Sequence, residues 1–598
     1  MKKKFLASPF ITMLALLTTL LFVCLSNAAS DQTVETPSPI AIPSDSVLHL
    51  IPEKTLGIIY CPNPLELDNR INALFRDLSP QSGSPEILAQ MLAGALGANF
   101  ESLADFETIG LDVNRDFAIF ITRLKPLQLS AAIHLKDTET VKQVIETETG
   151  GSAPTEYKNA AYWSENGDGN SFAILDDILV FSQQRTVCEN VIDTRHGTIQ
   201  AITENRGYQS FFTDMLEGAD QLGVCFDIEG VIASLDGSLE EEWKSMTDNL
   251  KNNSGSVSLV IGDLFEDLLK GRTEFIKQLQ SINAKLQVEG TDVQITPALE
   301  FKSDSEFVNA VQEVSDELTH LGGLPDRATM NAAFQGSSKL QTEISTSWLD
   351  FTPQDIRNKQ EKGDRLLEQV KDFYESLSDR WSVSTSFGDG TLPNHLFTYE
   401  LKDEQQAKTY MDEVFLEKLN YKDAYAGPST MHNGIEIKSY IFSNPNEVLG
   451  VTPSDPFEQM PPEWHWYYAF TEGQLLFTTG THPKLIQTAL DRRAGNGDKF
   501  SDHPSYQELT GKLGINNNIL LAISPITAFK SIIPVVEQMD PNSAAMIQMV
   551  SGAFMNLPEN YSIGFSAKAR DNGIDAKLLL TLGDFKPLIQ AFGMMFGM

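Results

Sequence analysis

The sequence predicts an α+β protein made of two tandem copies of a mainly antiparallel sheet-and-helix unit. Two observations lead to this prediction. Short runs that alternate apolar and polar residues are joined by turn residues and followed by helix-like stretches. The same landmarks then return in the same order in the second half of the chain. At 598 residues the chain also exceeds what one hydrophobic core usually holds, so at least two domains are expected.

Five landmarks carry the internal repeat. They pair Ile51 with Leu324, Leu135 with Leu401, Leu179 with Leu475, Tyr208 with Tyr506, and Gly290 with Gly573. Five weak matches in one order are hard to obtain by chance, so we interpret them as a duplication. The first unit is expected to span 45–320 and the second 321–598.

The second landmark shows how each unit is built. Residues 129–135 alternate between apolar and small or polar side chains, which is the period of a strand. Asp137 follows and is suited to cap a helix, because its carboxylate accepts bonds from free backbone N–H groups. Asp403 stands at the same place in the second copy, with Gln406 where a capping-box partner would lie. Hairpins with such helices between them predict antiparallel sheets covered by helices on one face.

The first 44 residues indicate export. Lys2, Lys3 and Lys4 precede an apolar stretch, and small residues lead to Ala28, which is the pattern of a cleaved secretory signal peptide over 1–28. Lipoprotein processing at Cys24 is a weaker alternative because Val23 precedes it, and retention of the segment as an anchor stays open. Residues 29–44 are rich in Pro and Ser and are interpreted as a linker. The expected location is periplasmic or secreted.

The chain is strongly acidic, with a formal net charge of −36. Cleavage after Ala28 removes three lysines and no acids, which leaves 42 basic residues against 81 acidic ones. Such a surface repels phosphate backbones, so no nucleic-acid partner is expected. The charge is typical of a soluble envelope protein and is also compatible with a basic protein partner.

Three cysteines remain in the mature chain: Cys61, Cys188 and Cys225. An odd number in an oxidising compartment allows at most one internal disulfide, for which Cys188 with Cys225 is the favoured pair. Three buried thiols are the equal alternative.

These features resemble an exported bacterial family catalogued as domain of unknown function 3352. The resemblance lies in the opening strand at 51–55, in Gly110-Leu111-Asp112 ahead of a strand, in the Lys-Asp helix cap, and in the Leu-Leu-Phe strand that leads into a helix. It covers most of the mature chain. The family carries no established activity, so the resemblance implies no catalytic residues.

The sequence contains no motif for catalysis, and we expect no catalytic, cofactor-binding or metal-binding residues. A Gly-x-Ser-x-Gly elbow, a His-Glu-x-x-His helix, a phosphate-binding loop and a dinucleotide glycine cluster are all missing. Asp112-x-Asn114-x-Asp116 resembles the start of a calcium loop. It has Phe117 where glycine is needed and Arg123 where the last glutamate is needed, so a polar turn is favoured.

Two stretches are candidate ligand contacts. Trp464, His465 and Trp466 form an aromatic run that is able to stack on a flat ligand, or that belongs to a strand whose alternate residues enter the core. Met546, Met549 and Phe554 lie in a Met-rich apolar stretch. Such stretches form adaptable surfaces for lipid or hydrophobic peptide, or pack on the sheet as an ordinary helix.

The expected function is therefore that of a non-catalytic envelope protein, a binding or scaffold module with an apolar groove for lipid or peptide. One alternative is a hydrolase that uses two acidic residues on an envelope or extracellular polymer, because the chain offers 81 carboxylates. The other is an acidic module that binds a basic protein.

Overall fold

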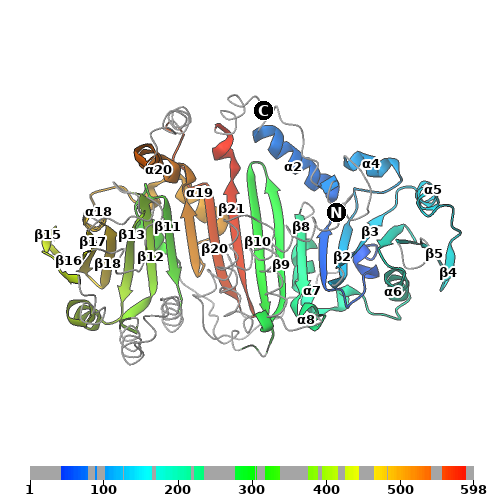
Figure 1. Cartoon of the computed structure of the whole chain (residues 1–598), viewed down its shortest axis with the longest axis horizontal. Coiled ribbons are helices and arrows are strands. Elements are labelled where there is room, and N and C mark those ends of the chain that lie inside the picture. The colour runs from blue at the N-terminus through cyan, green and yellow to red at the C-terminus, as the bar shows by residue number, and fades with distance from the viewer. Residues whose placement is uncertain are drawn as a thin grey trace. The chain divides into compact units, whose positions relative to one another are not determined.

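The computed structural model describes two compact units, which we call the N-terminal unit and the C-terminal unit (Figure 1). The described residues up to 305 belong to the first and those from 317 onward to the second. The described residues are 42–78, 88–89, 102–124, 127–164, 170–216, 221–234, 276–303, 305, 317–336, 373, 375–387, 393–414, 424–443, 463–480, 482–539, 555, 557–570 and 572–587.

The N-terminal unit contains one antiparallel sheet. Its strands are β1 (Gly57–Cys61), β2 (Phe117–Leu124), β3 (Leu127–His134), β4 (Thr155–Tyr157), β5 (Ala160–Ser164), β6 (Ser171–Leu175), β7 (Ile178–Ser182), β8 (Gln221–Asp227), β9 (Leu279–Glu289) and β10 (Asp292–Phe301). They pair in the order β4-β5-β6-β7-β3-β2-β1-β8-β9-β10.

Helices of the N-terminal unit close over this sheet. They are η2 (Val47–Leu50), α2 (Pro64–Leu78), α4 (Leu103–Thr108), α5 (Thr138–Glu148), α6 (Arg185–Arg195), η3 (Ile202–Glu204), α7 (Arg206–Leu216) and α8 (Ile228–Ala233). One hydrophobic core joins η2, α6 and α7 to β1, β2, β3 and β7, and it includes Val47, Ala118, Val180, Val191 and Phe211. This core lies between the helices and the sheet.

The sheet of the N-terminal unit is covered on both faces at its centre. All five residues of β7 are buried, as are the first five of β2. Successive side chains of a strand point to opposite faces, so both faces must be shielded from water there. Helices on one face were predicted, and the burial shows that the other face of the central strands is shielded as well.

The C-terminal unit repeats the strand order. Its strands are β11 (Met330–Gln335), β12 (Leu377–Phe387), β13 (Pro393–Leu401), β14 (Ala424–Ala426), β15 (Thr430–His432), β16 (Ile435–Ser443), β17 (Glu463–Thr471), β18 (Gln474–Gly480), β19 (Ile519–Ile523), β20 (Ile563–Arg570) and β21 (Gly573–Thr581). The short β14 and β15 both pair with β16, and the order continues β16-β17-β18-β13-β12-β11-β19-β20-β21.

Helices of the C-terminal unit occupy corresponding places along the chain. They are η4 (Thr319–Gly323), α15 (Glu404–Thr409) with a π-helical turn η5 (Tyr410–Val414), α18 (Lys484–Arg493), η7 (Phe500–Asp502), α19 (Pro504–Leu513), α20 (Pro525–Met539) and η8 (Leu582–Phe585). A core between the sheet and α18 contains Leu396, Leu476, Ile486 and Ala489. No helix among the described residues of either unit is long and apolar enough to cross a membrane.

Strand pairing relates individual residues of the two units. His134 pairs with Ile178 in the N-terminal unit as Glu400 pairs with Gln474 in the C-terminal unit. Likewise, Gly57 pairs with Ile121 as Met330 pairs with Thr385. If Leu135 is matched with Leu401, the strand pairings also match Leu179 with Leu475 and Ile51 with Leu324. These are the same matches as in the sequence landmarks. The fifth landmark is two residues out of register, since Asp292 corresponds to Gly573. We call residues at the same place in this pairing equivalent.

A helix contact extends the equivalence to α6 and α18. In the N-terminal unit, Asp193 of α6 accepts from the Tyr157 hydroxyl and lies 2.6 Å from the Lys158 ammonium. In the C-terminal unit, Asp491 of α18 lies 2.7 Å from His432 Nε2 and accepts from Asn433 Nδ2. Both carboxylates hold the hairpin turn beside them. Thr194 and Arg492, which follow these aspartates, are therefore equivalent.

The described structure confirms the α+β class, with antiparallel sheets and helices. The predicted caps are also present: Asp137 accepts from the backbone of Glu139 and Thr140, and Asp403 accepts from Gln406 N. The duplication itself stays a prediction, as do the unit limits 45–320 and 321–598. Thr319 and His320 of η4 belong to the C-terminal unit.

The three mature cysteines are free and buried, so Cys188 and Cys225 do not form the favoured disulfide. Both belong to the hydrophobic core of the N-terminal unit. Burial raises the pKa of the Cys61 and Cys188 thiols to about 12, and it raises that of Cys225 as well.

Candidate functional site

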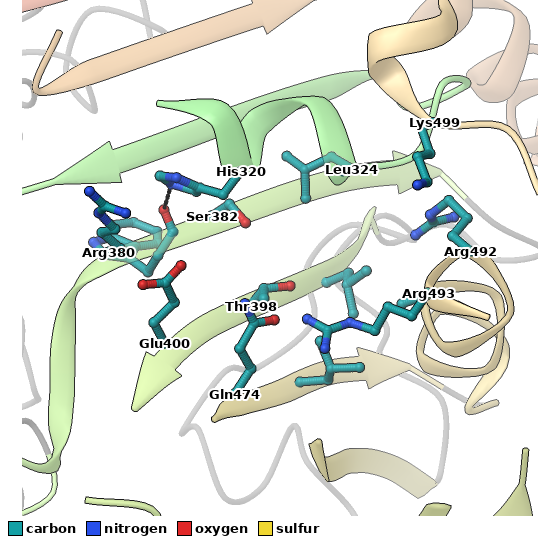
Figure 2. Close-up of a pocket in the computed structure, with 15 residues that line it drawn as sticks. His320, Leu324, Arg380, Ser382, Thr398, Glu400, Gln474, Arg492, Arg493 and Lys499 are labelled. Carbon is teal, nitrogen blue, oxygen red and sulfur yellow. Dashed lines mark hydrogen bonds between the residues drawn. The ribbon is translucent and has the colours of Figure 1, made fainter. Parts of the chain in front are cut away.

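A pocket opens inside the C-terminal unit between the sheet and helix α18. Its volume is about 220 Å³. The lining comes from η4 and the residue after it, from β12, β13, β18 and α18, and from the residue before η7. It consists of His320, Gly323, Leu324, Arg380, Trp381, Ser382, Leu396, Thr398, Glu400, Gln474, Leu476, Ala489, Arg492, Arg493 and Lys499. Figure 2 shows Arg492, Arg493 and Lys499 on one side, with Arg380 and Glu400 toward the opposite end.

The floor of this pocket is formed by neighbouring strands of the sheet. Ser382 of β12 pairs with Thr398 of β13, which is followed across the sheet by Leu476 of β18. All three line the pocket, and Ala489 of α18 lies above them. The strands and the helix cannot approach further, because Ile486 and Leu490 of α18 already pack in the shared core. A hollow remains beneath Ala489, whose side chain is a single methyl group.

Arg492 is the most unusual residue of the pocket. Its relative exposure is 4%, and its Nε has no hydrogen-bond partner. Burial lowers the pKa of the guanidinium, while the carboxylates of Asp326 and Asp491 act in the opposite direction. Among the described residues neither carboxylate lies within ion-pair distance of Arg492. An arginine keeps its proton in proteins, so a cation stands here without a direct counter-ion.

Two further cations stand at the open side of the pocket. Arg493 and Lys499 are exposed residues that line it next to Arg492. Arg493 donates from Nη1 to the Thr471 hydroxyl at 2.7 Å. Within the described part of the chain neither side chain forms an ion pair with a carboxylate. The three neighbouring cations produce a positive field in a protein whose net charge is −36.

The opposite end of the pocket is mixed in charge. Glu400 and Arg380 lie there, and His320 Nε2 is 3.2 Å from the backbone carbonyl of Trp381. A carbonyl only accepts, so Nε2 carries the proton of this imidazole. Burial is the main cause that lowers the pKa of His320, and the charge of Arg380 adds to it. The ring is therefore neutral at neutral pH and contributes shape more than charge.

Gln474 supplies a second buried polar atom without a partner. Its Oε1 is shielded from water and accepts no hydrogen bond. Gln474 also lines the pocket, where Figure 2 shows it between the arginine side and the Glu400 end. Buried polar atoms are nearly always hydrogen-bonded, so an unpaired amide oxygen and an unpaired guanidinium N–H around one hollow indicate groups that await a ligand or water.

The arrangement supports binding better than catalysis. The lining contains one carboxylate, Glu400, whereas glycoside hydrolysis by acidic residues needs two. It offers no cysteine, and its one serine, Ser382, is on the strand floor without a base bonded to it among the described residues. No group of three metal-ligating side chains occurs among the residues that the structure describes. The hydrolase alternative therefore gains no support from this pocket.

The equivalent place in the N-terminal unit is occupied by buried, mainly apolar residues. Ala118, Ala132 and Val180 stand where Ser382, Thr398 and Leu476 stand, and Val47 replaces His320. Thr194 takes the place of Arg492 and donates its hydroxyl to the backbone of Asn190 at 2.8 Å. All of these residues except Thr194 belong to one apolar core.

A buried polar network takes the place of Arg380 and Glu400 in the N-terminal unit. His134, which is fully buried, holds its Nε2 2.7 Å from Asp116 Oδ1. The other carboxylate oxygen accepts from the hydroxyls of Ser46 and Tyr60 and from the backbone N–H of Val47. Ser46 bonds to the aspartate and not to the imidazole, so these residues do not form a nucleophile-base pair. The network fastens η2 to the sheet.

The aromatic candidates from the sequence lie on β17, away from the pocket lining. Trp466 packs against Phe442 and Phe477, with ring centroids 4.8 and 5.5 Å apart, and Trp464 joins the same cluster. His465 points to the other face and stacks on Tyr467 at 5.5 Å. The structure thus separates the three residues between two faces and places both tryptophans in a packed aromatic cluster.

The other candidates, Met546, Met549 and Phe554, lie outside the described residues. The repeated tyrosines have packing roles: Tyr208 is buried and donates to the backbone carbonyl of Thr55 at 2.8 Å, and Tyr506 packs against Phe500.

The pocket residues were not singled out from the sequence. Two arginines at the end of a helix are common, because cations stabilise the negative end of the helix dipole. The one available signal was a comparison of the repeats, in which Arg492 stands where the first copy has Thr194.

Comparisons with known proteins add little. No protein-family model and no curated protein matches the chain, so the resemblance to the family of unknown function stays an expectation. Among solved structures, crystal form IV of TP0453 is 10% identical over 44% of this chain and 81% of that chain, with a TM-score of 0.25. Crystal form I is 9% identical over 45% and 81%, with a TM-score of 0.24. At these TM-scores the likeness carries no argument about fold or function.

Proposed function

We propose that the protein is an exported, non-catalytic module of the cell envelope that binds a small ligand inside its C-terminal unit. The observation that carries this proposal is the pocket of about 220 Å³ with cationic lining residues, at a place where the N-terminal unit has a buried apolar core. A hollow lined by unpaired polar atoms costs stability, and it is retained where it has a use. The signal peptide over 1–28, with cleavage near Ala28, belongs to the same proposal.

The N-terminal unit acts as a scaffold in this proposal. Its apolar core and its Asp116–His134 network fix the same layers without leaving a space. The proposal replaces the apolar groove as the binding site, since the cationic side chains among the lining residues favour a polar ligand.

Native mass spectrometry of the full mature chain, purified under mild conditions with an envelope extract, tests the proposal. We expect a bound small molecule that is lost in Ala489→Leu, because the larger side chain enters the pocket. Thr488→Leu is the matched control: it adds similar bulk on the exposed side of the same helix and should retain the ligand. If no small molecule of any charge binds, or if Ala489→Leu binds it as well as the control, the proposal is wrong.

A further inference from the structure

We propose that the pocket of the C-terminal unit binds an oxyanion group, a carboxylate or a phosphate, through Arg492 at its base and Arg493 and Lys499 at its opening. This rests on the proposed function, and it names the chemical class of ligand.

Arg492 needs a partner. A buried guanidinium without a counter-ion loses far more hydration energy than the end of helix α18 returns to it, because a helix dipole is worth only about 0.3–1 kcal/mol. The Asp326 and Asp491 carboxylates act on it only from beyond ion-pair distance. Asp491 is also occupied, since it accepts from Asn433 and lies 2.7 Å from His432. The N–H groups of Arg492 therefore remain available to a ligand.

The opening of the pocket favours an anion. Arg493 and Lys499 line it on the same side as Arg492 (Figure 2), so a ligand enters past two cations. Guanidinium groups present paired donors that match the oxygens of carboxylate and phosphate, whereas a lysine contributes a point charge. Glu400 lies toward the other end and disfavours a second negative group there.

The size of the hollow limits the ligand. Pockets for drug-sized molecules usually measure about 300–1,000 Å³. The observed volume of about 220 Å³ is smaller, so the ligand is a small acid or a single charged group of a larger molecule. The unpaired Oε1 of Gln474 is suited to accept from a hydroxyl or amide N–H of the same ligand.

The N-terminal unit provides an internal control. Arg195 is equivalent to Arg493, but its guanidinium lies 2.7 Å from Asp176 in an exposed ion pair. Thr194, equivalent to Arg492, has an internal hydrogen-bond acceptor. At these two positions the N-terminal unit has an uncharged residue and an arginine in an ion pair. The C-terminal unit has two arginines without an ion pair among the described residues.

Thermal unfolding of the full mature chain with inorganic phosphate or succinate tests the inference, with sodium chloride at equal ionic strength as the reference. We expect a saturable rise of the unfolding temperature with at least one of the two anions. In Arg492→Gln the dissociation constant should rise about tenfold or more, because a charge-assisted hydrogen bond is lost. Arg195→Gln, the matched change in the N-terminal unit, should respond like the parent protein.

The two anions separate the sources of the group. A response to phosphate alone assigns a phosphate-bearing ligand, and a response to succinate alone assigns a carboxylate. If Arg492→Gln fails to fold, Arg493→Gln with Lys499→Gln changes only exposed residues and should weaken binding several-fold.

No response beyond that of chloride, or an unchanged response in the arginine variants, overturns the inference. The proposed function fails separately. If Ala489→Leu removes a neutral or cationic ligand while neither anion binds, the module still binds a ligand but the oxyanion inference is wrong.

Discussion

The two units place different side chains in the same space between sheet and helix. In the N-terminal unit, Val47, Ala118, Val180 and Val191 close it as part of one apolar core. In the C-terminal unit the same space is a hollow bounded by Arg492 and other polar residues. The difference teaches that the side chains between sheet and helix can change while strand pairing and helix position are kept. The strand hydrogen bonds and the neighbouring apolar contacts hold the layers in place. Exchanging the differing residues between units tests this directly.

The largest effect is expected when the cation is copied into the filled unit. Thr194→Arg places a guanidinium at a position with 6% exposure beside an apolar core, without a counter-ion. We expect a loss of about 3–5 kcal/mol in the free energy of unfolding. Chemical denaturation followed by circular dichroism measures it, and Thr194→Val serves as the control of similar size. A loss below about 1 kcal/mol would show that the N-terminal unit tolerates charge at this position as the C-terminal unit does.

The next effect concerns the polar network of the N-terminal unit. Asp116→Ala removes the acceptor of the Ser46 and Tyr60 hydroxyls and of the Val47 N–H, and it leaves buried His134 without its partner. Unsatisfied buried donors are costly, so the free energy of unfolding should fall by about 2–3 kcal/mol. The matched change Arg380→Ala, at the equivalent half-buried position, should cost less in the same denaturation experiment. Equal losses of unfolding free energy would mean that Asp116 stabilises its unit no more than Arg380 stabilises the other.

A smaller effect of opposite sign is expected at the pocket. Arg492→Met replaces a buried, unpaired cation with an apolar side chain of similar length, which should raise the free energy of unfolding by about 1 kcal/mol. The same variant should lose the response to phosphate or succinate. A stabilised protein that still responds to these anions would separate the arginine from binding, and a destabilised one would show that the cation is paired in solution.

The smallest effect is a pH dependence that belongs to the C-terminal unit. The pKa of His320 lies below its ordinary value of 6.5 because of burial and the neighbouring Arg380. The unfolded chain therefore binds a proton at this residue more readily than the folded chain does. Stability should fall as pH drops through about 6.5 and reach its full loss below the folded pKa. Urea titrations from pH 8 to 5 should show a flatter dependence in His320→Gln; an identical slope would exclude His320 as a source.

The secondary structure could be predicted where local chemistry decides it. Asp137 and Asp403 follow alternating strands and cap helices as expected, because capping needs only a carboxylate at the first free N–H groups. Contacts between distant residues could not be predicted. Asp116 bonds to Ser46, 70 positions away, and no spacing rule connects them.

Burial was the missing quantity at the candidate site. Arg492 and Arg493 are neighbours in the sequence and look alike there, yet one is buried and the other exposed. That difference depends on how α18 packs in the folded unit, which side-chain periodicity alone does not give. The same reason explains why Trp464 and Trp466 stood out in the sequence: their size is visible there, but their packing against Phe442 and Phe477 is not.

The free thiols give one half of the molecule a natural chemical label. Cys61, Cys188 and Cys225 all belong to the N-terminal unit, and the C-terminal unit contains no cysteine. Their burial and raised pKa values suppress attack by alkylating reagents while that unit is closed. The rate of alkylation in native buffer therefore measures how often the N-terminal unit opens, without any engineered probe. Saturating the C-terminal pocket during such an experiment would reveal whether the two halves unfold together or independently.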